Sequence, residues 1–173
     1  MKFRKIKKRF LEKRYQSLLK EPEVKKKPVH QKVTTVGILG LETISQNVDL
    51  QQLVTNTFDV RNPKIYSFRA FSKDNESSYK HFSENDFDWK GNITDSSLQA
   101  FLDTEFDLLI TFFDQKHLYA EYVTLLSKAT FKVGYAEVDS RLFDMEVKTE
   151  GKDMDAYLNE VKKYLVILNR MDG

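Results

Sequence analysis

The stretch FDLLITFF, residues 106–113, is the most apolar segment of the chain. It contains no regular alternation of polar and apolar positions, which is typical of a strand that is covered on both faces. Such strands occur in parallel sheets that carry helices on each side. The segment therefore predicts an α/β fold, with these residues at the centre of the sheet.

Apolar runs on both sides of this segment alternate with stretches of helical periodicity. Further strands are expected at residues 33–39, 65–71 and 131–138, with an edge strand at 142–149. Helices are expected at residues 45–58 with Ser45 as the cap, and at 95–102, 114–128 and 154–171. Residues 72–84 are expected to form a polar surface loop, and residues 87–93 a short strand or a packed loop. The pattern predicts an open, mostly parallel twisted sheet of four to six strands with helices on both faces.

The charge of the chain is divided by position along the sequence. Residues 1–32 hold 13 of the 28 Lys and Arg but only 3 of the 26 Asp and Glu, a net charge of +10. The remaining residues hold 15 basic and 23 acidic side chains, a net charge of −8. We therefore predict a basic arm and linker at residues 1–32 and a Rossmann-like α/β domain at residues 33–173. Such asymmetry indicates a polyanionic partner.

The arm has the periodicity of a basic amphipathic helix. Its apolar side chains recur at intervals of three and four, which stacks them on one helical face; they are Phe3, Ile6, Phe10, Leu11, Tyr15, Leu18 and Leu19. We predict that the basic side chains around this stripe contact RNA; they are Lys2, Arg4, Lys5, Lys7, Lys8, Arg9, Lys13 and Arg14. The helix should stop at Glu21-Pro22, and residues 25–28 should form an extended linker.

Several partners would fit this helix. RNA phosphates, as on a ribosome-like surface, would attract its cations with an affinity that falls steeply with salt. An anionic bilayer would attract the cations and accept the apolar stripe, so that the chain would be a peripheral membrane-associated protein. A protein partner or a second copy of the chain would hold the stripe in a groove. The helix could also fold back on its own acidic body.

The chain contains no run of about 18 apolar residues, and its basic start lacks the apolar stretch of a secretory signal. We therefore expect a cytoplasmic protein without a transmembrane segment. The absence of Cys excludes disulfides, thiolate metal sites and Cys nucleophiles.

The body carries no catalytic signature, and we expect neither a cofactor nor a metal. The segment GILGLE, residues 37–42, lacks the glycine spacing that lets a backbone approach a pyrophosphate, and no P-loop is present. The three histidines, His30, His81 and His117, lack the i,i+4 pairing of a helical metal site. A ligand site, if present, would lie at the carboxyl ends of the strands.

Acidic side chains follow two of the expected strands. Asp114, Glu137 and Asp139 are the candidate ligand-binding residues, and they could hold a divalent cation or act as acid and base on a sugar or phosphate ligand. In the alternative interpretation, these carboxylates cap helices or face water. Trp89, beside Lys90 and near two phenylalanines, Phe82 and Phe87, could form a stacking surface for bases or close one side of the core.

Two resemblances arise from these segments. FDLLI at 106–110, LLSKA at 125–129, FKVGY at 131–135, KYLVIL at 163–168 and DWKG at 88–91 resemble an uncharacterised bacterial family known only as a domain of unknown function, over most of residues 33–171. This likeness implies a Rossmann-like body. FDLLI and VGY are also similar to the N-terminal half of heptosyltransferase-like glycosyltransferases, which implies a shared Rossmann-like half without the donor-binding second domain. We expect a non-enzymatic binding protein whose basic helix contacts RNA.

Overall fold

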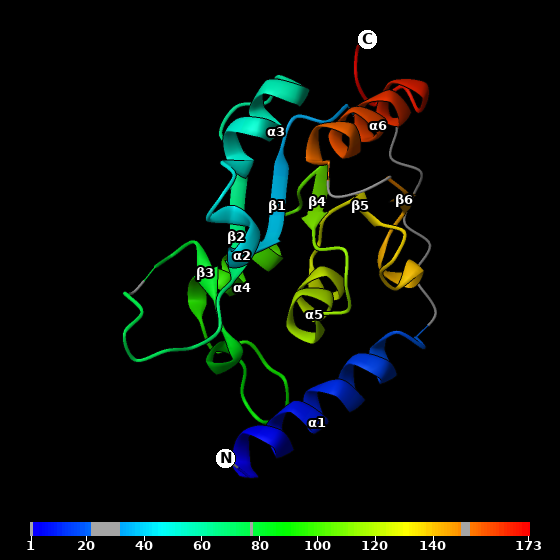
Figure 1. Ribbon diagram of the computed structural model, residues 1–173. Helices are drawn as coiled ribbons and strands as arrows, with labels where there is room; N and C mark the ends of the chain where they lie inside the picture. The colour runs from blue at the N-terminus through cyan, green and yellow to red at the C-terminus, as the bar shows by residue number, and fades with distance from the viewer. Residues whose placement is uncertain (1, 22–31, 77, 150–152) are drawn as a thin grey trace.

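The computed structural model describes residues 2–21, 32–76, 78–149 and 153–173, and these form a parallel α/β sheet with helices around it (Figure 1). Among these residues the sheet has six strands in the order β3-β2-β1-β4-β5-β6, and every pair is parallel. The strands are β1 (Val36–Leu41), β2 (Lys64–Phe68), β3 (His81–Phe82), β4 (Leu108–Phe112), β5 (Lys132–Tyr135) and β6 (Met145–Val147). The predicted open parallel sheet is confirmed.

The helices form layers on both faces of this sheet. They are α1 (Lys2–Leu18), α2 (Glu42–Ser45), α3 (Leu50–Phe58), α4 (Ser96–Asp103), α5 (Leu118–Leu126) and α6 (Met154–Ile167), with 3-10 turns η1 (Glu84–Asp86) and η2 (Ser140–Leu142). Helices α3 and α6 contact each other on one face, and α4 and α5 cover the other (Figure 1). The predicted N-terminal helix is α1, which lies beneath α5 at the end toward which the strands point. None of the described helices has the length and apolarity needed to cross a membrane.

Strand β4 is buried along its whole length, as its continuous apolarity predicted. Leu108, Leu109 and Ile110 have no exposed surface, and β1 and β5 pair with its two sides. Each such side chain contributes roughly 1.5–3 kcal/mol through burial. Adjacent residues point to opposite faces of the sheet, so the strand needs apolar side chains at consecutive positions.

Asp107 joins the entrance of β4 to the entrance of β1. Its Oδ2 accepts hydrogen bonds from the backbone N–H groups of Thr34 and Thr35 at 2.9 and 2.8 Å, and from their hydroxyls at 2.7 and 2.9 Å. The hydroxyl of Thr35 also accepts a bond from the backbone N–H of Asp107 at 3.0 Å. These bonds satisfy the hydrogen-bonding capacity of a residue that is only 6% exposed. They also join the segments that lead into the two central strands, and so help to align these strands.

Two local features differ from the expectations, and a third settles an open alternative. Strand β3 lies within the expected polar loop, and its two residues are too few to give a periodic signal. Ser45 ends α2, and the cap of the following helix is Asp49, whose side chain accepts a bond from the N–H of Gln52. Residues 87–93, expected as a short strand or a packed loop, form a packed loop closed by one antiparallel bridge between Phe87 and Ile93.

Replacing Asp107 by Asn should lower the free energy of unfolding by about 2 kcal/mol at neutral pH, because an amide oxygen is a weaker acceptor for these donors. Burial opposes ionisation, but the hydrogen bonds from Thr34 and Thr35 outweigh it and hold the pKa of this carboxyl below its usual value. A lowered pKa gives stability that is present above the unfolded-state pKa and is lost as the pH falls through the folded-state pKa.

Urea unfolding should therefore show a difference in the free energy of unfolding between wild type and Asp107→Asn, and this difference should become smaller as the pH falls below about 4. The exposed Asp74 provides the control. Asp74→Asn should change the free energy of unfolding little, both at neutral pH and below about pH 4. A gap that stays constant across this range would show that the charge of Asp107 does not matter.

Candidate nucleic-acid interface

Helix α1 is docked on the α/β body through part of its apolar stripe. Leu11, Tyr15 and Leu19 are 2%, 3% and 9% exposed, and their spacing of four residues places them on one face of the helix. The ring of Tyr15 meets the ring of Tyr122 from α5 edge to face, with 6.5 Å between centroids. The interpretation that the helix folds back on its own body therefore holds for this half of the stripe.

A buried hydrogen bond fixes the centre of α1 to the first turn of α5. The hydroxyl of Tyr15 donates to Oε2 of Glu121 at 2.8 Å, and Oε1 of the same carboxylate accepts from the backbone N–H of His117 at 2.6 Å. Glu121 is 5% exposed. Burial and the bond to Glu121 raise the pKa of Tyr15, so the phenol stays a donor at every physiological pH.

The loop at residues 88–92 holds α1 from another side. Nη1 of Arg14 donates to the backbone oxygen of Lys90 at 2.6 Å and to Oδ1 of Asn92 at 3.0 Å. Between them, Gly91 has a φ of 81°, and a Cβ there would lie 3.0 Å from Cδ1 of Leu11. The hydroxyl of Tyr122 donates to the backbone oxygen of Gly91 at 2.9 Å. The helix can approach this loop because Gly91 has no side chain.

The start of α1 is attached by an ion pair. Arg4 forms a salt bridge with Oε1 of Glu84, a carboxylate that is 5% exposed and whose Oε2 accepts a bond from the backbone N–H of Phe71 at 3.1 Å. Arg4 therefore neutralises a buried charge of the protein itself. Arg14, through the bonds above, is likewise engaged within the molecule. These two predicted RNA contacts serve docking, and the side chain of Lys2 lies outside the described residues.

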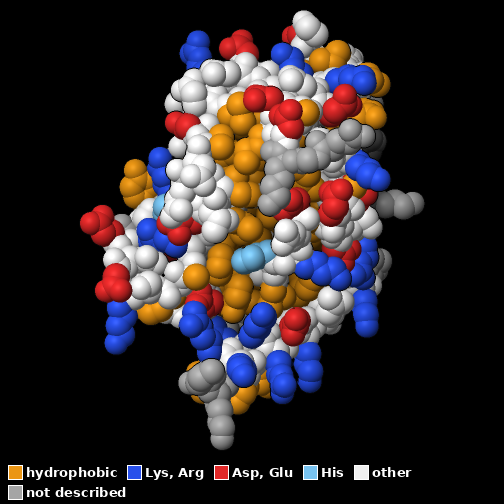
Figure 2. Space-filling view, viewed as in Figure 1, with side chains coloured by type: hydrophobic (Ala, Val, Ile, Leu, Met, Phe, Trp, Pro, Cys, Tyr) orange, Lys and Arg blue, Asp and Glu red, His pale blue; other side chains and the backbone are white. Residues whose placement is uncertain are grey.

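Most of the other predicted cations remain on the surface. Lys5, Lys8, Arg9 and Lys13 are exposed, whereas Lys7 is partly buried and burial lowers its pKa. Within the part of the chain that the structure describes, none of these five forms an ion pair. Figure 2 shows Lys and Arg side chains crowded over the end of the molecule where α1 lies. The arrangement is a cationic surface on a helix that is docked on the body by buried side chains and hydrogen bonds.

The first half of the apolar stripe is exposed beside these cations. Phe3, Ile6 and Phe10 are 77%, 51% and 48% exposed. The ring of Phe10 contacts that of Trp89, which is itself 55% exposed, at 6.1 Å with the planes nearly perpendicular. The ammonium of Lys90 lies 5.0 Å from the centre of the Trp89 ring. We call Phe3, Ile6, Phe10 and Trp89 the aromatic patch.

The aromatic cluster expected around Trp89 is divided by the structure. Phe82 and Phe87 are each 1% exposed and belong to the core, whereas Trp89 faces outward. The sequence does not show the pairing of Trp89 with Phe10, because 79 positions separate these residues along the chain. The only signal was the presence of an aromatic residue between polar neighbours in a loop.

The acidic strand ends do not assemble into one cluster. Asp139 accepts bonds from Nε and Nη2 of Arg141 at 2.9 and 2.6 Å and caps η2. Asp114 and Glu137 instead act on Tyr135: burial first, and then the charges of these two carboxylates, raise the pKa of its phenol. The described residues contain no group of His, Asp or Glu side chains arranged to hold a metal; His30 lies outside them.

The strand order reverses between β1 and β4, which in open α/β sheets is where ligands bind. The start of α5, which follows β4, would there present its free N–H groups to an anion. In this protein the carboxylate of Glu121 and the imidazole of His117 already accept from that turn, with Nδ1 of His117 bonded to the N–H of Ala120 at 3.2 Å. Burial lowers the pKa of His117, which keeps this acceptor neutral. A phosphate would have to displace these groups.

The fold and the surface define a parallel α/β protein with a basic helix docked at the carboxyl ends of its strands. The chain belongs to the family of unknown function DUF6913, whose family model matches residues 7–168. The match spans most of α1 as well as the sheet. Neither the curated proteins nor the solved structures contain a significant match. The similarity to heptosyltransferases is not supported.

Replacing Leu11 by Ala should lower the free energy of unfolding by about 3 kcal/mol, because it leaves a cavity between α1 and the body. Ile6→Ala is the matched control in the same helix, and because Ile6 is half exposed it should cost less than about 0.5 kcal/mol. Chemical denaturation of both variants checks this. Equal, small effects would mean that α1 is not docked in solution.

Proposed function

We propose that this protein is a non-enzymatic binding protein whose α1 surface binds RNA. The observation that carries the proposal is the set of exposed cations on a docked helix, namely Lys5, Lys8, Arg9 and Lys13. Each cation placed near a phosphate releases condensed counterions, and this release is the main source of affinity for a polyanion. A ribosome or another RNA-rich assembly in the cytoplasm would present such phosphates.

The docking of α1 supports this proposal energetically. Isolated, the helix would be destabilised by repulsion between like charges at i,i+4 positions, such as Lys5, Arg9 and Lys13. Its packing against the body through Leu11 and Tyr15 offsets that repulsion before any partner arrives. RNA would then bind a preformed surface without the cost of ordering it. The net charge of −8 on residues 33–173 would confine contact to the α1 side.

The aromatic patch favours single-stranded RNA over a duplex. Unpaired bases stack on exposed aromatic rings, with about 1–3 kcal/mol per base, whereas the bases of a duplex are already stacked on one another. Phe10 and Trp89 lie directly beside the cations, so a strand could place its phosphates on α1 and a base on Trp89. The ligand that this surface fits best is therefore a single-stranded loop or end of an RNA.

An anionic membrane surface is the second candidate. Phe3 and Ile6 are 77% and 51% exposed, and an exposed apolar stripe flanked by Lys and Arg is also the pattern of a helix that lies in a bilayer interface. The two partners differ in what they do to the aromatic patch. Bases stack on it in an aqueous environment, whereas lipid removes it from water.

Changing Lys5, Arg9 and Lys13 together to Gln should weaken binding to a single-stranded RNA oligonucleotide and reduce the salt dependence. The slope of log affinity against log salt should fall in magnitude by about 2, because each lost phosphate contact removes roughly 0.7. The control removes the same charge from exposed lysines outside α1, with Lys73, Lys148 and Lys163 changed to Gln. Fluorescence anisotropy titrations at several salt concentrations measure both. Equal affinities and slopes for the two triple variants would refute the proposal.

Trp89 is the sole tryptophan of the chain, so its emission reports directly on the aromatic patch. Stacking of a base on the indole should quench this emission without a large shift in wavelength. Anionic vesicles, if they bind, should instead shift the emission to shorter wavelength, because the ring leaves water. Quenching by the oligonucleotide with no response to vesicles is the expected result. A blue shift with vesicles and no response to RNA would assign the surface to a membrane.

A further inference from the structure

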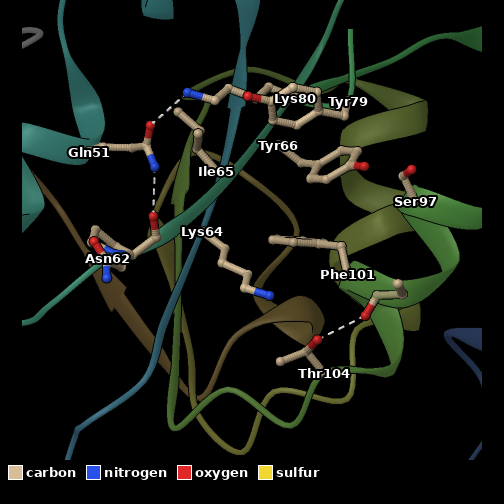
Figure 3. A pocket seen from close by; sticks show the side chains of 12 residues that line it. Gln51, Asn62, Lys64, Ile65, Tyr66, Tyr79, Lys80, Ser97, Phe101 and Thr104 are labelled. Atoms are coloured by element: carbon tan, nitrogen blue, oxygen red, sulfur yellow. Dashed lines mark hydrogen bonds between the residues drawn. The ribbon is translucent and has the colours of Figure 1, made fainter.

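A pocket of about 560 Å³ opens beside β2, and none of its lining residues comes from α1. Its walls are supplied by α3, by β2, by the segment that leads into β3 and by α4 (Figure 3). This volume lies within the range of about 300–1,000 Å³ that small organic ligands occupy. No predicted site residue lines it.

The pocket exists because β3 covers only the end of β2. The paired residues are Ser67 with His81 and Phe68 with Phe82, so no strand covers the edge of β2 before Ser67. The N–H of Ser67 donates to the backbone oxygen of Lys80 at 2.9 Å. Alternate residues of a strand direct their N–H and C=O groups to the same side. The backbone groups of Ile65 therefore face the pocket, where a ligand can bond to them.

The charge of the pocket is purely cationic. Two of its twelve lining residues are lysines, Lys64 and Lys80, and none is Asp or Glu. Lys80 donates to the neutral Oε1 of Gln51 at 3.2 Å, while the side chain of Lys64 extends toward α4 (Figure 3). The lining thus carries the opposite sign to residues 33–173 as a whole, whose net charge is −8. The pocket therefore favours an anion.

Aromatic rings form the floor and the rim. The rings of Tyr66 and Phe101 lie 5.0 Å apart at an angle of 40°, and both residues are buried. Tyr79 at the rim is 76% exposed. Aromatic faces of this kind bind planar rings by stacking. The hydroxyl of Ser97 adds a polar group on the wall formed by α4 (Figure 3).

We propose that this pocket binds a nucleoside monophosphate. The base stacks against Tyr79 above the Tyr66 and Phe101 rings, its polar edge bonds to the backbone of Ile65, and the phosphate pairs with Lys64. Lys80, on the opposite rim, raises the local potential. The site is separate from the α1 surface, so it does not depend on RNA binding.

The test uses the full chain with AMP, GMP, CMP and UMP, with adenosine and inorganic phosphate as partial ligands. Isothermal titration calorimetry should show saturable binding of at least one nucleotide with a dissociation constant below about 1 mM. Both partial ligands should bind at least about tenfold more weakly, because each lacks half of the contacts. No saturable binding of any nucleotide, or equal binding of inorganic phosphate, would overturn the proposal.

Variants separate this site from the rest of the surface. Lys64→Gln and Tyr79→Ala alter exposed side chains and should each weaken nucleotide binding by about fivefold or more. Lys73→Gln, which removes an exposed charge outside the pocket, should have no effect, and the same is expected of the triple α1 variant described above. If Lys64→Gln bound as Lys73→Gln does, the assignment would fail. If only the α1 variant lost binding, the nucleotide would be bound by α1 instead.

Discussion

The hydrogen bond between Tyr15 and Glu121 is the contact on which the arrangement of α1 depends. It links two groups that are both almost fully buried, so the loss of either would leave the other with an unmet polar group away from water. The same carboxylate also closes the first turn of α5. One side chain thereby sets the position of α1 and occupies the place where many α/β proteins bind an anion. The basic helix is thus attached next to the edge of the sheet at which ligands bind in many open α/β proteins.

Docking through apolar contacts and hydrogen bonds leaves the charges of α1 available. Among the described residues, a single ion pair, between Arg4 and Glu84, joins this helix to the body. If attraction between a basic arm and an acidic body had driven docking, many such pairs would be expected. Docking instead buries apolar side chains of the N-terminal segment, Leu11 and Leu19, against the body. The uneven distribution of charge along the sequence is therefore also present on the surface, where most cations of α1 stay exposed.

The strands could be predicted from the sequence where they lie in apolar runs, and not where, as in β3, two residues pair within a polar stretch. Continuous apolarity identifies β4 because both of its faces are covered. Strand β3 forms because it pairs with β2, and a tertiary contact of only two residues cannot be predicted from the sequence pattern. The pocket beside β2 exists because β3 is so short, and so the pocket could not be predicted from the sequence either. Ser45 and Asp49 are both acceptable caps by residue type, and only the actual path of the backbone selects Asp49.

The division of the α1 stripe shows why the interface could be predicted only in part. Periodicity groups Phe3 with Leu11, but it does not say which of the two meets the body, since that depends on Gly91, Glu121 and Trp89, which are distant in sequence. The forces that act on the two halves of the helix also respond differently to salt. Apolar burial is not weakened by screening, whereas contacts between exposed cations and phosphates are screened within about 10 Å at 0.1 M salt. Added salt should therefore weaken the binding of any polyanion to α1, while α1 itself stays attached to α5 and the loop at residues 88–92.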